Sequence, residues 1–112
     1  MHKVLDKMVF KIKADFLKAL ARPLRLEIIE YLKDKEASVG KIVQVLGVSQ
    51  SNLSRQLGTL REAGVLYARQ EKTTVYYGIQ DHEIYRVLRP IAEILRKRMI
   101  KSEKLLEQLG RD

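Results

Sequence analysis

The stretch VSQSNLSRQLGTLREAG, residues 48–64, decides the fold of this chain. Leu53, Leu57 and Leu60 recur at the spacing of one helical face, with Val48 just before them. Ser49 is a preferred residue for capping the start of a helix, and Gly64 for ending one. The other positions are hydroxyls, amides, glycines and two arginines, with a single acid. The pattern predicts a helix that is anchored on one side and thin and nearly free of carboxylates on the other.

A short helix is expected immediately before this stretch. Ser38 is placed to cap it, and Gly47 supplies the left-handed residue that stops it. Its expected buried positions are Val39, Ile42, Val43 and Leu46. Two helices separated by a few residues around a glycine have the spacing of a helix-turn-helix, here at about residues 38–63.

The period of the pattern changes after residue 64. VLYARQ (65–70) and TTVYYGI (73–79) are rich in valine, tyrosine and threonine, and Val75, Tyr77 and Ile79 alternate onto one face. We expect a β-hairpin joined at Glu71-Lys72, although its tip lacks the glycine that tight hairpin turns prefer. A hairpin that follows a helix-turn-helix is a wing, here at about residues 65–79.

Further helices flank this core. Residues 3–20 have helical periodicity, and a second helix from Pro23 is expected to bury Leu24, Ile28, Ile29 and Leu32. Residues 81–109 predict a last helical region that Asp81 caps and that Pro90 kinks or breaks. One small domain cannot bury both flanking apolar faces, so we expect a symmetric homodimer. Its expected interface comprises Leu5, Met8, Val9, Ile12, Phe16, Ile84, Val87, Leu88, Ile91, Leu95 and Met99.

The predicted fold class is therefore mainly α-helical with a small β-hairpin, a winged helix-turn-helix of order α-α-α-α-β-β-α that fills residues 1–112 as one domain. The chain has no cysteine, which excludes disulfides and thiolate metal ligands within it. It has no apolar core of a signal peptide and no run of about 20 apolar residues. We expect a cytoplasmic protein.

The distribution of charge points to the partner. The net charge is +8, and no acid occurs between Glu36 and Glu62. A helix that enters the major groove of DNA needs amides and hydroxyls to read bases, and no carboxylate facing phosphates. Any one of these polar residues has solvated surface as an equal alternative, whereas the set favours DNA contact. The candidate residues are Lys41, Ser49, Gln50, Ser51, Asn52, Ser54, Arg55, Gln56 and Arg61, with Arg69, Lys72, Thr73 and Thr74 in the wing.

Two of these side-chain types suggest particular contacts. Gln50, Asn52 and Gln56 can pair with adenine or donate to guanine. Arg55 can bind guanine through two hydrogen bonds, or grip a phosphate.

The runs ARPLRLEIIEYL (21–32), SVGKIVQVLGVSQSNLSRQLGTLREAGVLYARQ (38–70) and TTVYYGI together resemble the ArsR/SmtB family of bacterial and archaeal winged-helix repressors, over roughly residues 14–95. The resemblance implies a homodimer that binds an inverted repeat of double-stranded DNA in its own promoter and releases it when an inducer binds. The family often has histidine where this chain has Gln56, and usually glycine where it has Lys72. Both departures affect site preference.

The metal sites of that family are not matched. Its arsenic-binding Cys-Val-Cys motif reads Ser38-Val39-Gly40 in this sequence. Its zinc site uses a pair of residues at the start of the last helix, which read Asp81 and Glu83 in this sequence. A second pair, one turn apart on the last helix of the partner subunit, completes that site, and its positions read Ile94 and Lys97. We therefore expect no metal at these positions and no cofactor.

The remaining effector hypotheses are open. One is an organic small molecule of unknown identity near Phe16, Tyr31, Tyr85 or Met99, for which ordinary core packing is the alternative. The other is that the protein has no effector.

Three rival classes stand beside a DNA-binding regulator. An enzyme is not expected, because there is no cysteine nucleophile, no Gly-rich phosphate loop and no neighbouring pair of histidines. A winged-helix module that binds RNA or protein without recognising an operator is the main alternative. A purely structural dimerisation module is another, and it predicts that loss of Arg55 changes nothing.

Overall fold

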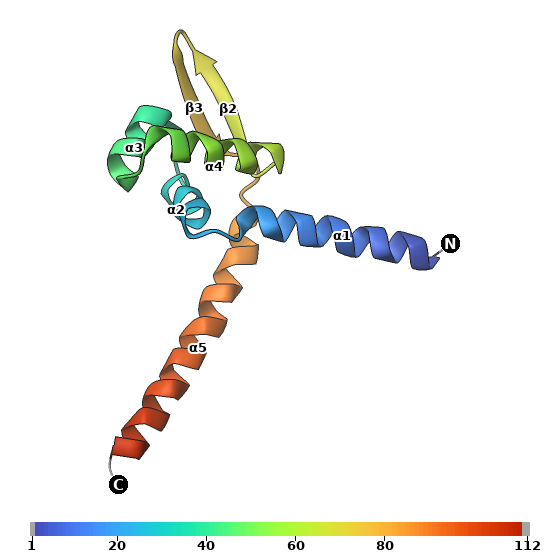
Figure 1. Ribbon diagram of the computed structural model, residues 1–112, viewed down its shortest axis with the longest axis vertical. Coiled ribbons are helices and arrows are strands. Elements are labelled where there is room, and N and C mark those ends of the chain that lie inside the picture. Colours follow the sequence, from blue (N-terminus) through green and yellow to red (C-terminus); the bar gives the residue numbers. More distant parts are fainter. Residues whose placement is uncertain (1, 111–112) are drawn as a thin grey trace. The chain divides into compact units, whose positions relative to one another are not determined.

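The computed structural model describes residues 2–110, and the surroundings of the side chains from 6 to 108. The residues up to Asp81 form one compact unit, and those from His82 onward form a second. The first unit contains α1 (His2–Leu20), α2 (Pro23–Tyr31), β1 (Ala37–Ser38), α3 (Val39–Leu46), α4 (Gln50–Glu62), β2 (Leu66–Glu71) and β3 (Thr74–Ile79), and the second is the helix α5 (Ile84–Gly110) (Figure 1). This order is the expected winged helix-turn-helix with one strand added.

The ends of α3 and α4 follow the predicted chemistry. The hydroxyl of Ser38 accepts a hydrogen bond from the backbone N–H of Lys41 at 3.2 Å, and that of Ser49 accepts one from Asn52 at 3.2 Å. Each bond satisfies a donor that the first turn of a helix leaves unpaired. Gly47 ends α3 with a φ of 65°. The turn between the two helices is therefore defined by short-range contacts.

Aliphatic side chains from several elements of the first unit form its core. The three leucines of α4 are at most 1% exposed, as predicted, and so are Ile28, Ile29 and Leu32. Ile42 is completely buried, whereas its neighbours on α3 are only partly covered. Four other residues that were expected to be buried are only partly covered, because they lie at the margins of a small core: Leu24, Val39, Val43 and Leu46.

The wing is part of a three-stranded antiparallel sheet of order β1-β3-β2. The two-residue strand β1, which the sequence did not reveal, pairs Ala37 with Tyr77 and Ser38 with Tyr76. The hairpin is closed by the pair of Glu71 and Thr74, so the turn is residues 72–73, one position later than predicted. Lys72 has a φ of 56°, a left-handed conformation that glycine adopts more easily.

The faces expected at a dimer interface are mostly free within one chain. The exposed fraction lies between 43% and 65% for Met8, Val9, Ile12, Val87, Ile91, Leu95 and Met99. Phe16 and Leu88 are half-buried, and the side chain of Leu5 lies outside the described region. Ile84 is only 6% exposed in the single chain. Its assignment to a free interface is therefore wrong.

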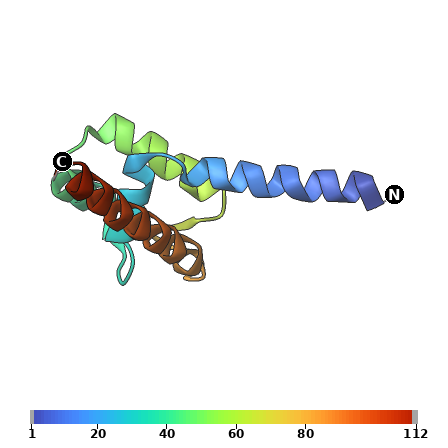
Figure 2. The same ribbon diagram turned by 90° about the horizontal axis from the view of Figure 1, so that it is seen from below.

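The second unit is one unbroken helix (Figure 2). It begins at Ile84 after a turn at His82–Glu83, and the backbone N–H groups of Tyr85 and Arg86 donate to the carbonyl oxygens of that turn. The helix runs through Pro90, and the expected break is absent. Proline removes one backbone hydrogen bond, but Arg86 and Pro90 are both exposed, which lets water reach the carbonyl that is left. None of the described helices is long and apolar enough to cross a membrane.

Candidate nucleic-acid interface

The exposed face of α4 is built as the sequence predicted. Burial of its leucines turns Gln50, Ser51, Ser54, Arg55 and Arg61 outward, and Ser49 is exposed at its start. Within the described part of the chain, no carboxylate is paired with Arg55 or with Arg61. Both guanidinium groups are therefore available to an anionic partner.

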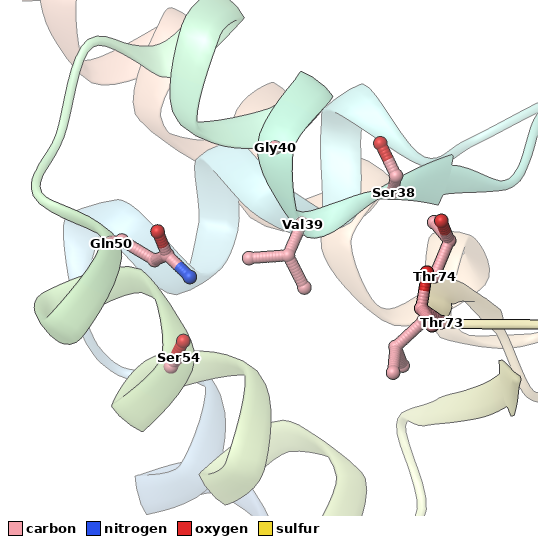
Figure 3. Close-up of a pocket in the computed structure, with 8 residues that line it drawn as sticks. Ser38, Val39, Gly40, Gln50, Ser54, Thr73 and Thr74 are labelled. Atoms are coloured by element: carbon pink, nitrogen blue, oxygen red, sulfur yellow. The ribbon is translucent and has the colours of Figure 1, made fainter.

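A pocket of about 460 Å³ lies beside this face. Three segments line it: the junction of β1 and α3, the first half of α4, and the tip of the wing, which contribute Ser38, Val39, Gly40, Gln50, Ser54, Thr73, Thr74 and Val75. Figure 3 shows Gln50 and Ser54 on one side of it and Thr73 and Thr74 on the other, with Val39 between them. The lining carries hydroxyls and an amide but no charge.

Two exposed lysines complete the cationic part of the surface. Lys41 lies in the first turn of α3, and Lys72 lies at the tip of the wing. The partial positive charge at the start of a helix also favours an anion near the first turns of α3 and α4. The first unit thus presents polar and basic groups from α3, α4 and the wing.

Arg69 differs from the other candidate cations. Its guanidinium lies 2.8 Å from a carboxylate oxygen of Glu36 and 3.0 Å from one of Glu71, and it stacks over the ring of Tyr76 at 4.7 Å. The bonds from Arg69 and Tyr67 hold the pKa of Glu36 below its usual value, and the same carboxylates raise the pKa of Arg69. Two carboxylates thus offset its charge, so Arg69 stabilises the wing and is a weak candidate for phosphate.

Gln56 is buried, with 4% of its surface exposed, so its expected role as an outward reader of bases has to be corrected. Its side-chain oxygen accepts a hydrogen bond from Nε of Arg25 at 2.8 Å, and its Nε2 donates to Oδ1 of Asn52 at 3.2 Å. Gln56 flanks the leucine face of α4, where α2 covers it. The sequence did not single out Arg25, because its partner is 31 positions away and no local pattern joins the two.

No group of three or more histidine or acidic side chains gathers at a metal-binding distance among the residues that the structure describes. At the start of α3, the hydroxyl of Ser38 already accepts the capping hydrogen bond from Lys41. The chemistry available at the candidate interface is therefore hydrogen bonding and positive charge.

Comparison with known proteins places this arrangement among regulators. The model of the bacterial regulatory protein arsR family matches residues 22–68. The HTH-type transcriptional regulator Rv0081 of Mycobacterium tuberculosis H37Rv is 37% identical over 102 residues, which are 90% of each chain. Its crystal structure superposes with a TM-score of 0.75 over 83% of this chain and 94% of that one.

Two further solved structures are similar. The transcriptional repressor BigR from Xylella fastidiosa is 30% identical, with a TM-score of 0.68 over 84% of this chain and 95% of that one. The homodimeric winged helix-turn-helix DNA-binding domain of Mb0332 from Mycobacterium bovis is 26% identical, with a TM-score of 0.73 over 84% of this chain and 87% of that one. In each of them the similarity extends well beyond the helix-turn-helix.

Proposed function

This chain belongs to the ArsR family of bacterial transcriptional regulators and is a DNA-binding regulator, and we propose that it represses transcription by binding an inverted-repeat operator as a homodimer. The observation that carries the proposal is the exposed face of α4, which centres on Arg55 and is free of carboxylates until Glu62. The comparisons give no support to the alternative of a module that binds RNA or protein.

In this proposal α4 enters the major groove. Gln50, Ser51 and Ser54 contact base edges or phosphates, and Arg55 donates to guanine or to a phosphate. Lys41 and Arg61 bind the flanking backbone, and Lys72 and Thr73 at the wing tip bind the next stretch of it. The pocket between α4 and the wing supports this division, because its hydroxyls face the space between the two contacting elements.

Dimerisation would follow from the exposed apolar faces of α1 and α5. Exposed contiguous apolar surface marks an interaction site, and this chain has one such face on each helix. The homodimeric domain of Mb0332 supports the same assembly here. A twofold dimer would present two α4 helices to half-sites about one helical turn of DNA apart.

The effector in this proposal is not a metal held at the positions used by the metal-sensing members. Ser38 and Gly40 offer no thiolate, and Ile94 and Lys97 offer no zinc ligand. Two means of control are then open to the protein. Either an organic small molecule acts as the effector, or the amount of protein alone sets the level of repression.

The test is fluorescence anisotropy of a labelled duplex from upstream of the gene, titrated with protein in the presence of a chelator. We expect tight binding, with an affinity that falls by about 10³ or more between 50 and 200 mM salt as several phosphates are neutralised. A duplex with one half-site scrambled is the control. Equal binding to both duplexes, or no dependence on salt, would contradict the proposal. Added zinc and arsenite should leave the complex intact, and release of DNA by either would reveal a metal site.

A further inference from the structure

A chain of hydrogen bonds crosses the first unit from the end of α1 to the start of α4. The guanidinium of Arg25 donates from Nη1 to the carbonyl oxygens of Ala19 at 3.2 Å and Lys18 at 3.3 Å. These carbonyls lie in the last turn of α1, and that of Lys18 also accepts a hydrogen bond from the backbone N–H of Ala21 at 3.2 Å. The Nε–H of the same guanidinium donates to Gln56, and Gln56 donates to Asn52.

Arg25 fixes which group donates and which accepts at each step of this series of hydrogen bonds. An arginine side chain has only donors, so the atom of Gln56 that lies 2.8 Å from Nε must be the amide oxygen. The other end of that amide, Nε2, then faces Asn52 and must meet an acceptor. Oδ1 of Asn52 is therefore turned toward Gln56, and its Nδ2 is turned away. The usual ambiguity between the two ends of an amide is removed at both residues.

Asn52 lies where this polarity matters for DNA. It is the third residue of α4, is only half-buried, and stands beside the exposed Ser51. Its backbone N–H is already bonded to the capping hydroxyl of Ser49. Among the described residues, its Nδ2 has no hydrogen-bond partner. The oxygen of Asn52 is thus directed at a side chain that is only 4% exposed, whereas its two N–H donors face away from Gln56 and are what it presents to a ligand.

We propose that Asn52 contacts DNA as a donor only, and that Gln56 and Arg25 are positioning residues that hold it in this orientation. The inference rests on the proposed function and makes it more specific. An asparagine that pairs with adenine must donate to N7 and accept from N6 at once, and that pairing is closed to Asn52 while its oxygen is turned toward the buried Gln56. Its target is an acceptor on DNA, either on a base edge or on a phosphate.

A double-mutant cycle of Asn52→Ala and Gln56→Glu tests the polarity. A carboxylate at position 56 still accepts from Arg25 but cannot donate, so the amide of Asn52 must turn and present its oxygen to DNA. In the wild-type background Asn52→Ala should weaken binding by roughly tenfold, the loss of one hydrogen bond. In the Gln56→Glu background the same change should cost less than about twofold. The charge that Gln56→Glu adds is present on both arms of that comparison and cancels.

An equal loss in both backgrounds, with unchanged thermal unfolding midpoints, would overturn the proposal. Binding to operators that carry single base-pair changes shows whether Asn52 donates to a base or to a phosphate. A contact to phosphate makes the cost of Asn52→Ala the same on every operator, whereas a contact to a base removes the cost on one of them.

A measurement on the free protein keeps the inference separate from DNA binding. The side-chain amide protons of Gln56 should exchange slowly with water by NMR, and Asn52→Ala should accelerate that exchange at least severalfold. Ser51→Ala, one residue away and exposed, is the control and should leave the exchange unchanged. Unchanged exchange in Asn52→Ala would overturn the orientation even if Gln56→Glu did not fold. If the wild-type protein bound no duplex, the proposed function would fail, and this exchange would still decide the orientation.

Discussion

Tyr67 donates its phenolic hydrogen to a carboxylate oxygen of Glu36 across 2.6 Å. The ring of Tyr67 lies over Gly78 on the paired strand, where an added Cβ would collide with it. Glu36 also accepts hydrogen bonds from Arg69, so one carboxylate just before β1 contacts two residues of β2. The wing is therefore joined to the body of the first unit by polar side chains as well as by strand pairing.

The contacts of Glu36 with Tyr67 and Arg69 predict how the stability of the wing depends on pH. The folded state lowers the pKa of Glu36, so its stabilisation is complete above the ordinary value near 4.5 and is lost as the pH falls through the lowered value. Glu36→Gln removes the titrating group. We expect the thermal midpoint of the wild type to exceed that of Glu36→Gln at pH 6, and the difference to shrink toward pH 3. A difference that stays constant over this range would contradict the assignment.

Lys72 predicts opposite effects on stability and on DNA affinity. Its left-handed backbone costs a residue with a side chain about 1 kcal/mol relative to glycine. Lys72→Gly should therefore raise the free energy of unfolding by up to about that amount in urea denaturation, and Lys72→Asn by less. Both changes remove the cation at the wing tip and should weaken operator binding. Lys72→Ala, which keeps the strain, is the control for loss of charge, and its affinity should match that of the other two variants.

Arg55 predicts the largest loss of DNA affinity from a single side chain. Arg55→Ala should weaken binding at least tenfold, on the order of 1–3 kcal/mol, because the side chain lies in the middle of the exposed face of α4. Its unfolding midpoint should not change. Arg86→Ala, which removes an exposed arginine of α5, is the matched control and should bind nearly as well as the wild type. Full affinity in Arg55→Ala would favour the purely structural dimerisation module.

Ile91 tests the dimer. Its side chain is 46% exposed on the apolar face of α5, and a charge placed there would be buried in the proposed interface. Ile91→Asp should shift sedimentation from dimer toward monomer at micromolar concentration and weaken DNA binding in parallel. Arg89→Asp is the control, because it changes the net charge by more than Ile91→Asp does but lies off the apolar face of α5. This variant should stay dimeric. A dimeric Ile91→Asp would place the interface elsewhere.

Local chemistry made much of the fold predictable from the sequence. Ser38, Gly47 and Ser49 act on their own neighbours, so each cap or stop could be assigned from a few adjacent residues. The strand β1 could not be assigned, because two residues are too few to show an alternating pattern. The continuity of α5 through Pro90 depends on solvent exposure, which the sequence does not display.

The candidate site also has features that the sequence made predictable and features that it did not. The outward position of Arg55 follows from the leucine spacing of its own helix. The burial of Gln56 does not, because a polar residue on the flank of a helix is exposed or covered according to what packs beside it. Here α2 brings Arg25 to that flank, and the guanidinium makes burial of the amide favourable. The offset charge of Arg69 likewise depends on Glu36, 33 positions away.

Ser38 belongs to two structures at once, since it is the last residue of β1, paired with Tyr76, and the residue that caps α3. No flexible linker therefore separates the wing from the helix-turn-helix. The two parts are preorganised, with their separation set before any duplex is encountered, and binding loses little conformational entropy between them. Operators whose grooves are spaced to suit that fixed separation would bind without distortion, and others would have to bend to fit it.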